Sequence, residues 1–259
     1  MKIVVLGKGF LGQAFAKEGY EVLGREDVSI ESRETDLLWK KRLEGYNVII
    51  NCMGKSDTRW CELNFDEAFW SNAIVPKILS GYCAGNGIKF VHISTGCLYD
   101  DMMMSQMETD FLAKHCCYTV TKFVGEKGCR VDRDLIIRPR LFFGDFPHKN
   151  NLICKLKRFN SFVGEWNSFT SVHVIVKAVW ELLLSRASGV YNVCCDGEAT
   201  VADLADWMGL YGTRMTGKEL RERESLFLVN NTMCIEKLKS IYQPPALREE
   251  FMRCVRDLG

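Results

Sequence analysis

Three glycines close to the N-terminus restrict the fold more than any other feature of the chain. The segment Gly7-Lys8-Gly9-Phe10-Leu11-Gly12 follows an apolar, β-rich run at 2–6 and leads into a helix-like stretch at 13–16. In such a unit the first glycine permits a tight turn, the second lets the backbone approach a pyrophosphate, and the third lets the helix pack closely. The helix N-terminus then attracts the anion. We therefore predict a dinucleotide-binding loop made by Gly7, Gly9, Phe10, Leu11 and Gly12; a glycine turn without a ligand is the alternative.

The order of strand-like and helix-like segments predicts an α/β fold. Short β-rich runs alternate with helical stretches, and helical periodicity extends from Val172 to Leu184. Such alternation is typical of a doubly wound parallel sheet, the Rossmann architecture. The expected strands are residues 2–6, 21–23, 47–51, 89–94, 135–138 and 189–193.

The domain organisation has to be inferred without a linker, because no stretch has the composition of one and no internal repeat is present. A second lobe would then be assembled from insertions and the tail. We expect residues 1–145 plus 170–194 to form the dinucleotide-binding Rossmann domain. Residues 146–169 plus 195–259 are expected to form a small C-terminal substrate-binding lobe.

Charge and hydropathy exclude two classes of partner. The 34 basic and 33 acidic residues are spread along the chain and give a net charge of +1, which is unlike the basic footprint of a nucleic-acid-binding protein. No apolar run approaches the ~20 residues needed to span a bilayer. The sequence therefore predicts neither a nucleic-acid nor a membrane partner, and it permits a homodimer without revealing the oligomeric state.

The 12 cysteines are expected to be reduced thiols. Cys116-Cys117 and Cys194-Cys195 are adjacent pairs, an unsuitable arrangement for separate loop-closing bridges. Paired CxxC motifs, which a structural zinc site would need, are missing from the sequence, so no metal is expected. The start Met1-Lys2-Ile3 has no signal-peptide character, which predicts a cytoplasmic protein.

Arg25 bears on which dinucleotide is bound. The second expected strand is followed by Gly24-Arg25-Glu26-Asp27. Enzymes that use NAD usually place an acid at this strand end for the ribose 2′-hydroxyl, whereas an arginine suits a 2′-phosphate. We therefore predict NADPH, with NADH as the alternative cofactor; a solvated loop arginine is the competing interpretation.

Tyr118 and Lys122 have the spacing of an acid–base pair. They are four residues apart, so a helix places them on one face. A neighbouring ammonium favours the phenolate, which lets the tyrosine act as a general acid near neutral pH. The pair follows an expected strand that ends in Ser94-Thr95-Gly96-Cys97.

In these features the chain resembles the extended short-chain dehydrogenase/reductase superfamily. The resemblance implies that Thr95, or Ser94 beside it, binds the substrate carbonyl oxygen next to the tyrosine. It also implies cofactor contacts by Lys122 and by the backbone at Asn51, which ends the third expected strand.

Further motifs narrow the resemblance to nucleotide-sugar reductases of the dTDP-4-dehydrorhamnose reductase type. The shared segments are Asn72-Ala73-Ile74-Val75-Pro76, Glu108-Thr109-Asp110 and Gly125-Glu126. The chain is still more similar to the bifunctional UDP-4-keto-6-deoxyglucose 3,5-epimerase/4-reductases of rhamnose synthesis. That similarity covers about residues 1–195 and lies in Gly24-Arg25, Trp60-Cys61-Glu62, Thr95-Gly96-Cys97 and Asn151-Leu152-Ile153-Cys154-Lys155.

This closer resemblance implies acid–base roles for Cys97 and Lys155. Epimerisation beside a carbonyl needs a base on one ring face and an acid on the other, and a thiol and an amine can fill those places. Each residue also has a simpler interpretation: Cys97 as a small buried apolar residue, and Lys155 as part of a solvated helix face. Arg138 and Arg140 could bind the nucleotide phosphates or pair with helix acids, and His115 is expected to be a loop histidine.

The combined expectation is an NADPH-dependent 3,5-epimerase/4-reductase with a nucleotide-sugar substrate. It would convert UDP- or dTDP-4-keto-6-deoxy-D-glucose to the nucleotide-activated L-rhamnose. One alternative is a 4-keto sugar reductase without epimerase activity. Another is an NADP-binding regulatory subunit of a different enzyme, although the intact set Thr95, Tyr118 and Lys122 argues against it. The sequence leaves the nucleotide base undecided.

Overall fold

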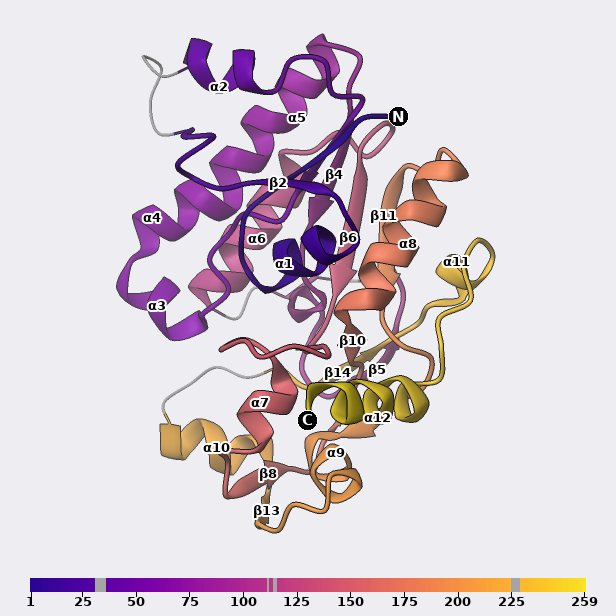
Figure 1. Ribbon diagram of the computed structural model, residues 1–259. Helices are drawn as coiled ribbons and strands as arrows, with labels where there is room; N and C mark the ends of the chain where they lie inside the picture. The colour runs from indigo at the N-terminus through magenta and orange to yellow at the C-terminus, as the bar shows by residue number, and fades with distance from the viewer. Residues whose placement is uncertain (31–35, 111, 114–115, 225–228) are drawn as a thin grey trace. The chain divides into compact units, whose positions relative to one another are not determined.

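The computed structural model describes residues 1–30, 36–110, 112–113, 116–224 and 229–259 (Figure 1). His115 lies outside the described residues. The chain divides into two compact units. The first consists of Met1–Ser94, Cys116–Ile137 and Ser188–Val190, and the second of Thr95–His115, Arg138–Ala187 and Tyr191–Gly259. This division does not show which ligand each unit binds. The assignment of a cofactor lobe and a substrate lobe therefore stays a prediction.

A six-stranded sheet confirms the predicted α/β class. Its strand order is β11-β6-β4-β3-β1-β2, and β1 pairs in parallel with both β2 and β3, as do β3 with β4 and β4 with β6. The chain leaves β1 for one neighbour and later returns on its other side, so the carboxyl end of β1 is a switch point of the topology. The strands are β1 Ile3–Leu6, β2 Glu21–Leu23, β3 Val48–Asn51, β4 Lys89–Ile93, β6 Leu135–Pro139 and β11 Gly189–Val193, each within about a residue of its predicted range.

The helices of the first unit pack on this sheet and on one another. Helix α1 contacts β1 and β2, and α5 contacts β4, while α3, α4, α6 and the π-helical turn η2 form one group with α5 (Figure 1). Asn72 of η2 joins two segments of this group: its side chain bonds both backbone groups of Lys55 and the hydroxyl of Thr121. The elements are α1 Phe10–Lys17, α2 Asp36–Arg42, α3 Thr58–Leu63, α4 Phe65–Phe69, η2 Trp70–Ile74, α5 Val75–Gly85 and α6 Cys117–Lys127.

The second unit is built from short elements that the sequence pattern largely did not reveal. Only the helix from Val172 to Leu184 was predicted, and α8 has these bounds. Four two-stranded sheets, β10-β7, β12-β9, β13-β8 and β14-β5, connect the remaining segments. The other elements are η3 Gly96–Leu98, β5 Met103–Gln106, β7 Phe142–Phe143, α7 Leu152–Leu156, β8 Ser161–Val163, β9 Trp166–Asn167, β10 Thr170–Ser171, β12 Ala199–Thr200, α9 Val201–Trp207, β13 Thr213–Met215, α10 Gly217–Glu224, β14 Asn231–Met233, α11 Glu236–Lys239 and α12 Leu247–Leu258.

Buried polar side chains hold these short elements together. The Tyr99 hydroxyl accepts a hydrogen bond from Arg138 Nη1 at 2.8 Å and donates to Asn192 Oδ1 at 2.7 Å. The Asn192 amide in turn donates to the carbonyl oxygens of Gln106 and Cys234. Because a buried polar group is stable only when it is hydrogen-bonded, this network orders segments that are far apart in the sequence.

The structure also bears on the cysteines, on membrane-spanning helices and on metal sites. All 12 cysteines are free thiols. Within the described ranges, no helix combines the length and the apolar character needed to cross a bilayer. The same residues contain no group of three or more His, Cys, Asp or Glu side chains placed to hold a metal ion.

Gly12 and Gly81 lie within helices but have different surroundings, which gives a test of the close packing of α1. A Cβ at Gly12 would overlap the carbonyl oxygen of Gly7, whereas a Cβ at Gly81 meets no atom within 4 Å. We expect Gly12→Ala to lower the free energy of unfolding by about 1–3 kcal/mol through steric strain. Gly81→Ala should raise it by about 0.4–1 kcal/mol, because alanine reduces the entropy of the unfolded chain. Urea unfolding followed by circular dichroism measures both, and effects of the same sign would contradict this packing.

Candidate functional site

The glycine loop has the backbone conformation and the open space that an anion site requires. Gly7 adopts a φ of +110°, in the region that favours glycine, and its N–H donates to the Leu23 carbonyl at 2.7 Å. Gly9 precedes α1, and a Cβ there would meet no atom within 4 Å. The first turn of α1 has neither a side-chain cap nor an acidic residue, so its N–H groups can bind a negatively charged group. Phe10 and Leu11 are buried, which leaves their backbone as the part able to touch a ligand.

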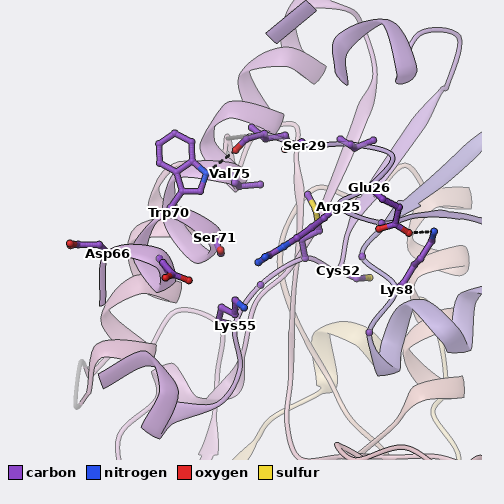
Figure 2. Close-up of a pocket in the computed structure, with 18 residues that line it drawn as sticks. Lys8, Arg25, Glu26, Ser29, Cys52, Lys55, Asp66, Trp70, Ser71 and Val75 are labelled. Carbon is purple, nitrogen blue, oxygen red and sulfur yellow. Dashed lines mark hydrogen bonds and ion pairs between the residues drawn. The ribbon is translucent and has the colours of Figure 1, made fainter. Parts of the chain in front are cut away.

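A pocket of about 700 Å³ opens beside this loop in the first unit (Figure 2). Its walls come from the segments that follow β1, β2 and β3 and from α4 and η2. Trp70 Nε1 donates to the carbonyl of Ile30 at 2.8 Å and so holds the segment after β2 against η2. The volume lies within the ~300–1,000 Å³ range of ligand pockets.

Lys8, the residue between the first two glycines, forms ion pairs with two acidic residues. Its ammonium contacts Glu26 (Figure 2). It also lies 3.0 Å from Asp27 Oδ2. The bond from Lys8 lowers the pKa of Glu26, and a bond from the Gly24 N–H lowers the pKa of Asp27. Both carboxylates after β2 are therefore charged and already paired.

Arg25 differs from the other cations of the pocket. Its side chain points into the pocket (Figure 2), and it has no hydrogen bond or ion pair among the residues that the structure describes. Lys55, by contrast, lies with its ammonium 4.3 Å from the centre of the Trp60 ring. Arg25 is thus available to bind an anionic group inside the pocket.

Helix α6 carries Tyr118 and Lys122 on one buried face, as their spacing predicts. The Lys122 ammonium donates to the Ile93 carbonyl at 2.7 Å, at the end of β4. Burial lowers the pKa of Lys122 to about 8, although the charge of Glu126 acts in the opposite direction. The lysine thus remains mostly protonated near neutral pH but can lose its proton in mildly basic solution.

The Asn51 side chain is buried and already hydrogen-bonded within the protein. It is fully buried, its Nδ2 lies 3.2 Å from His92 Nδ1, and its Oδ1 accepts from the Met53 N–H at 3.1 Å. Burial, together with the charge of Lys122, lowers the pKa of His92, so its imidazole is neutral. The Asn51 side chain shapes the turn after β3, which leaves the predicted cofactor contact to its backbone.

Thr95 and Cys97 lie together in the second unit. The Thr95 hydroxyl oxygen accepts from the Cys97 N–H at 3.1 Å and caps η3. This bond uses a lone pair and leaves the hydroxyl hydrogen free to donate to a substrate oxygen. Ser94, in the first unit, has a buried hydroxyl without a hydrogen-bond partner in the described part of the chain, so it stays the alternative.

Arg140 contacts Cys97, which the sequence did not predict. Arg140 Nη1 lies 3.3 Å from the Cys97 sulfur, and Arg140 Nε and Nη2 donate to Asn167 Oδ1 at 3.1 and 2.6 Å. The guanidinium is 2% exposed, so it has no surface on which to bind a phosphate, and no described acid forms an ion pair with it. The sequence indicated that Arg140 follows an expected strand, but it does not show that the partner of Arg140 lies 43 residues away.

Lys155 lies on α7, in the same unit as Cys97. The helix is capped by Asn151, whose Oδ1 accepts from the Ile153 N–H at 3.1 Å and whose Nδ2 donates to two loop carbonyls. Lys155 also helps to lower the pKa of His148, after burial and Lys149. Its pairing with Cys97 in acid–base chemistry stays a prediction.

The lowered pKa of Lys122 predicts a pH-dependent contribution to stability. Between about 8 and the ordinary value of 10.5, the unfolded chain binds more protons at this lysine than the folded protein does. The free energy of unfolding therefore gains from Lys122 as the pH rises through this window. We expect the difference in unfolding free energy, native protein minus Lys122→Met, to increase between pH 8 and pH 10 in urea titrations. Lys127→Met, at an exposed lysine of the same helix, controls for the lost charge; parallel curves for the two variants would refute the assignment.

Comparison with protein families and curated proteins gives two matches. A model of the family described as the RmlD substrate binding domain matches residues 1–210. The chain is also 26% identical, over 211 residues, to a protein of Arabidopsis thaliana. That protein is the trifunctional UDP-glucose 4,6-dehydratase/UDP-4-keto-6-deoxy-D-glucose 3,5-epimerase/UDP-4-keto-L-rhamnose-reductase. The match covers 74% of this chain and 31% of the plant protein, so the chain spans about a third of that relative's length.

Solved structures share the fold over almost the whole chain. A dTDP-4-dehydrorhamnose reductase from Clostridium acetobutylicum aligns with a TM-score of 0.83 and 22% identity, and covers 99% of both chains. The UDP-rhamnose synthase of Acanthamoeba polyphaga mimivirus aligns with a TM-score of 0.85 and 18% identity, again over 99% of each chain. At these identities the likeness establishes a common fold.

Proposed function

The chain belongs to the RmlD substrate binding domain family, and from this premise we propose that it is an NADPH-dependent enzyme acting on a nucleotide-linked 4-keto-6-deoxyhexose. The observation that carries the proposal is the pocket beside the glycine loop, with Arg25 pointing into it and without an ion-pair partner among the described residues. The names of the plant relative and of the solved reductases point to the same class of substrate. The preferred activity is 3,5-epimerisation followed by 4-reduction, which yields a nucleotide-activated L-rhamnose.

The residues of the first unit fit a bound NADPH. The open space at Gly9 and the uncapped start of α1 suit the pyrophosphate, and Arg25 suits the 2′-phosphate. Glu26 and Asp27, the two acids that follow β2, already bind Lys8. Neither is therefore free to bind a 2′-hydroxyl, which favours NADPH over NADH. When bound, the nicotinamide supplies the hydride for reduction at C4.

Tyr118, Lys122 and Thr95 provide the proton chemistry at the substrate carbonyl. Tyr118 donates its proton to the C4 oxygen as that oxygen gains negative charge. Lys122, held by the Ile93 carbonyl, places a positive charge on the same helix face and so stabilises the phenolate that remains. The Thr95 hydroxyl hydrogen, which the η3 cap does not use, donates to the same oxygen; Ser94 is the alternative donor.

Cys97 and Lys155 provide the epimerisation chemistry in this proposal. The protons on C3 and C5 flank the carbonyl and become acidic when hydrogen-bond donors hold the C4 oxygen. One residue removes the proton from one ring face, leaving an enolate, and the other returns a proton to the opposite face. A thiol and an amine can each gain or lose a proton near neutral pH when the environment is suitable.

Two other functions remain to be separated from this one. A 4-keto sugar reductase without epimerase activity would need Thr95, Tyr118 and Lys122 but not Cys97. A regulatory subunit that merely binds NADP would need none of these four. Exchange of the C3 and C5 protons without NADPH identifies the epimerase, and NADPH oxidation with a 4-keto sugar excludes the purely regulatory function.

Substitution of Arg25 tests the cofactor assignment. We expect Arg25→Ala to lower the ratio of kcat/KM with NADPH to kcat/KM with NADH by roughly 10- to 100-fold, because a hydrogen-bonded charge on the 2′-phosphate is lost. Fluorescence titration with each dinucleotide should show the same selective loss of affinity. Arg42→Ala, which removes an exposed arginine paired with Glu21, is the control and should leave the ratio unchanged. A native ratio in Arg25→Ala would show that another residue binds the phosphate.

Substitution of Cys97 tests the epimerase assignment. Incubation with UDP- or dTDP-4-keto-6-deoxyglucose in heavy water, without NADPH, should introduce deuterium at C3 and C5. Cys97→Ser should abolish this incorporation but retain some reduction of the pre-epimerised 4-keto-L-rhamnose nucleotide. Cys234→Ser, at another half-buried cysteine, is the control. Native incorporation in Cys97→Ser would leave the reductase as the better assignment.

A further inference from the structure

Arg140 carries a buried positive charge without a carboxylate beside it. Its side chain is almost completely inaccessible, and no aspartate or glutamate among the described residues pairs with it. A guanidinium is always protonated in proteins, and it only donates hydrogen bonds. Burying such a charge is unfavourable unless a partner compensates it.

The hydrogen-bond partners of Arg140 single out Cys97. The Asn167 amide oxygen accepts two of its N–H groups and the carbonyl of Val229 accepts another; both acceptors are neutral. The remaining partner is the Cys97 sulfur, 3.3 Å from Nη1. Of the groups bonded to this guanidinium in the described chain, Cys97 alone can carry a negative charge.

We propose that Arg140 is a positioning residue that holds the sulfur of Cys97 in place and favours its thiolate form. The inference rests on the proposed epimerase function for its catalytic meaning. Hydrogen bonds to two threonines hold the backbone on both sides of the contact between Arg140 and Cys97. The Arg140 N–H donates to Thr170 Oγ1 at 2.9 Å, and the Cys97 N–H donates to Thr95 Oγ1 at 3.1 Å. These two bonds hold the backbone of Arg140 and Cys97, and the Nη1 contact then holds the sulfur beside the guanidinium.

The proton balance of the step shows what Arg140 adds. The thiolate takes the proton from C3 or C5: the C–H bond breaks, an S–H bond forms, and the electron pair of the C–H bond enters the enolate. The acid on the other ring face then returns a proton to the same carbon, which completes the inversion. The thiol regains its anionic form by releasing its proton to solvent, and the acid takes a proton up from solvent, which restores both groups. The buried guanidinium favours the release because it compensates the charge of the thiolate.

Alkylation of Cys97 tests this role without any substrate. Because the thiolate is the reactive form, loss of the cation should slow the reaction of Cys97 with iodoacetamide, quantified for its own peptide by mass spectrometry. We expect Arg140→Gln to lower the rate by roughly tenfold or more, the scale of a lost hydrogen bond to a charged group. Arg140→Lys, which keeps the charge, should recover part of the rate. A purely structural arginine predicts the opposite, because loosened packing exposes the sulfur and speeds alkylation; a faster or unchanged rate would overturn the proposal.

Proton exchange gives the second readout. In Arg140→Gln the kcat for deuterium incorporation at C3 and C5 should fall by a larger factor than the kcat for reduction of the pre-epimerised substrate, with little change in KM. Arg138→Gln is the matched control, because Arg138 is also a buried arginine, two residues before Arg140 at the end of β6, that bonds the Tyr99 hydroxyl and makes no hydrogen bond to Cys97 in the described structure. It should keep the native ratio of exchange to reduction. An equal loss of exchange in both variants would overturn the proposal.

These measurements distinguish failure of the inference from failure of the proposed function. If the native protein shows no exchange, the epimerase assignment fails, and alkylation still decides whether Arg140 acts on Cys97. If Arg140→Gln does not fold, the decision passes to Arg140→Lys and to the native protein. There, Cys97 should react faster than Cys234, which is also half-buried and has no arginine bonded to its sulfur in the described structure. Equal or slower reaction of Cys97 would overturn the proposal.

Discussion

The close approach of α1 to the glycine loop is the constraint on which the first unit depends. Only a residue without a Cβ fits at Gly12, where any side chain would overlap the Gly7 backbone. This contact sets the start of α1 at the carboxyl end of β1, which is the switch point of the sheet. Because β2 and β3 flank β1 in parallel, their following segments also reach this edge and line the pocket. The position of Arg25 is thus a consequence of helix packing several residues away.

Two buried cations are hydrogen-bonded to neutral acceptors. Lys122 in the first unit bonds a backbone carbonyl, and Arg140 in the second bonds an amide oxygen and a carbonyl. Neutral acceptors satisfy the hydrogen-bonding geometry without neutralising the charge. The charge remains able to act on a neighbouring phenol or thiol, which a carboxylate partner would largely prevent. The two residues differ because Lys122 can lose its proton, as its lowered pKa indicates, whereas an arginine keeps its charge.

The sequence predicted the parts of the structure that depend on local pattern. The six strands and α8 follow from β-rich runs and helical periodicity, and they have nearly the predicted bounds. The existence of α1 and α6, but not their bounds, was predicted from the glycine spacing and the Tyr118–Lys122 pair. The sequence did not predict the two-residue strands of the second unit, because such short pairings depend on buried partners such as Asn192 and Tyr99 that are far apart in the chain. Likewise, the sequence could place Arg25 after β2, but it could not show that the two acids following Arg25 pair with Lys8 and that no described acid pairs with Arg25. The contact between Arg140 and Cys97 arises from tertiary packing, for which a single sequence carries no direct signal.

The distribution of residues between the units has a consequence for the chemistry. The pocket beside the glycine loop, Tyr118 and Lys122 belong to the first unit, whereas Cys97, Arg140 and Lys155 belong to the second. Reduction and epimerisation would both use the polarised C4 carbonyl, but they place different demands on the protein. Reduction needs a proton donor beside a bound dinucleotide, whereas epimerisation by a thiol needs that thiol to be held in place and negatively charged when it takes the proton. A thiol alone meets that demand poorly, because most of it is protonated near neutral pH. A buried guanidinium with otherwise neutral partners supplies the missing stabilisation, so the cysteine motif and Arg140 form one functional group, and a relative with the cysteine but without such a cation should be a weaker base.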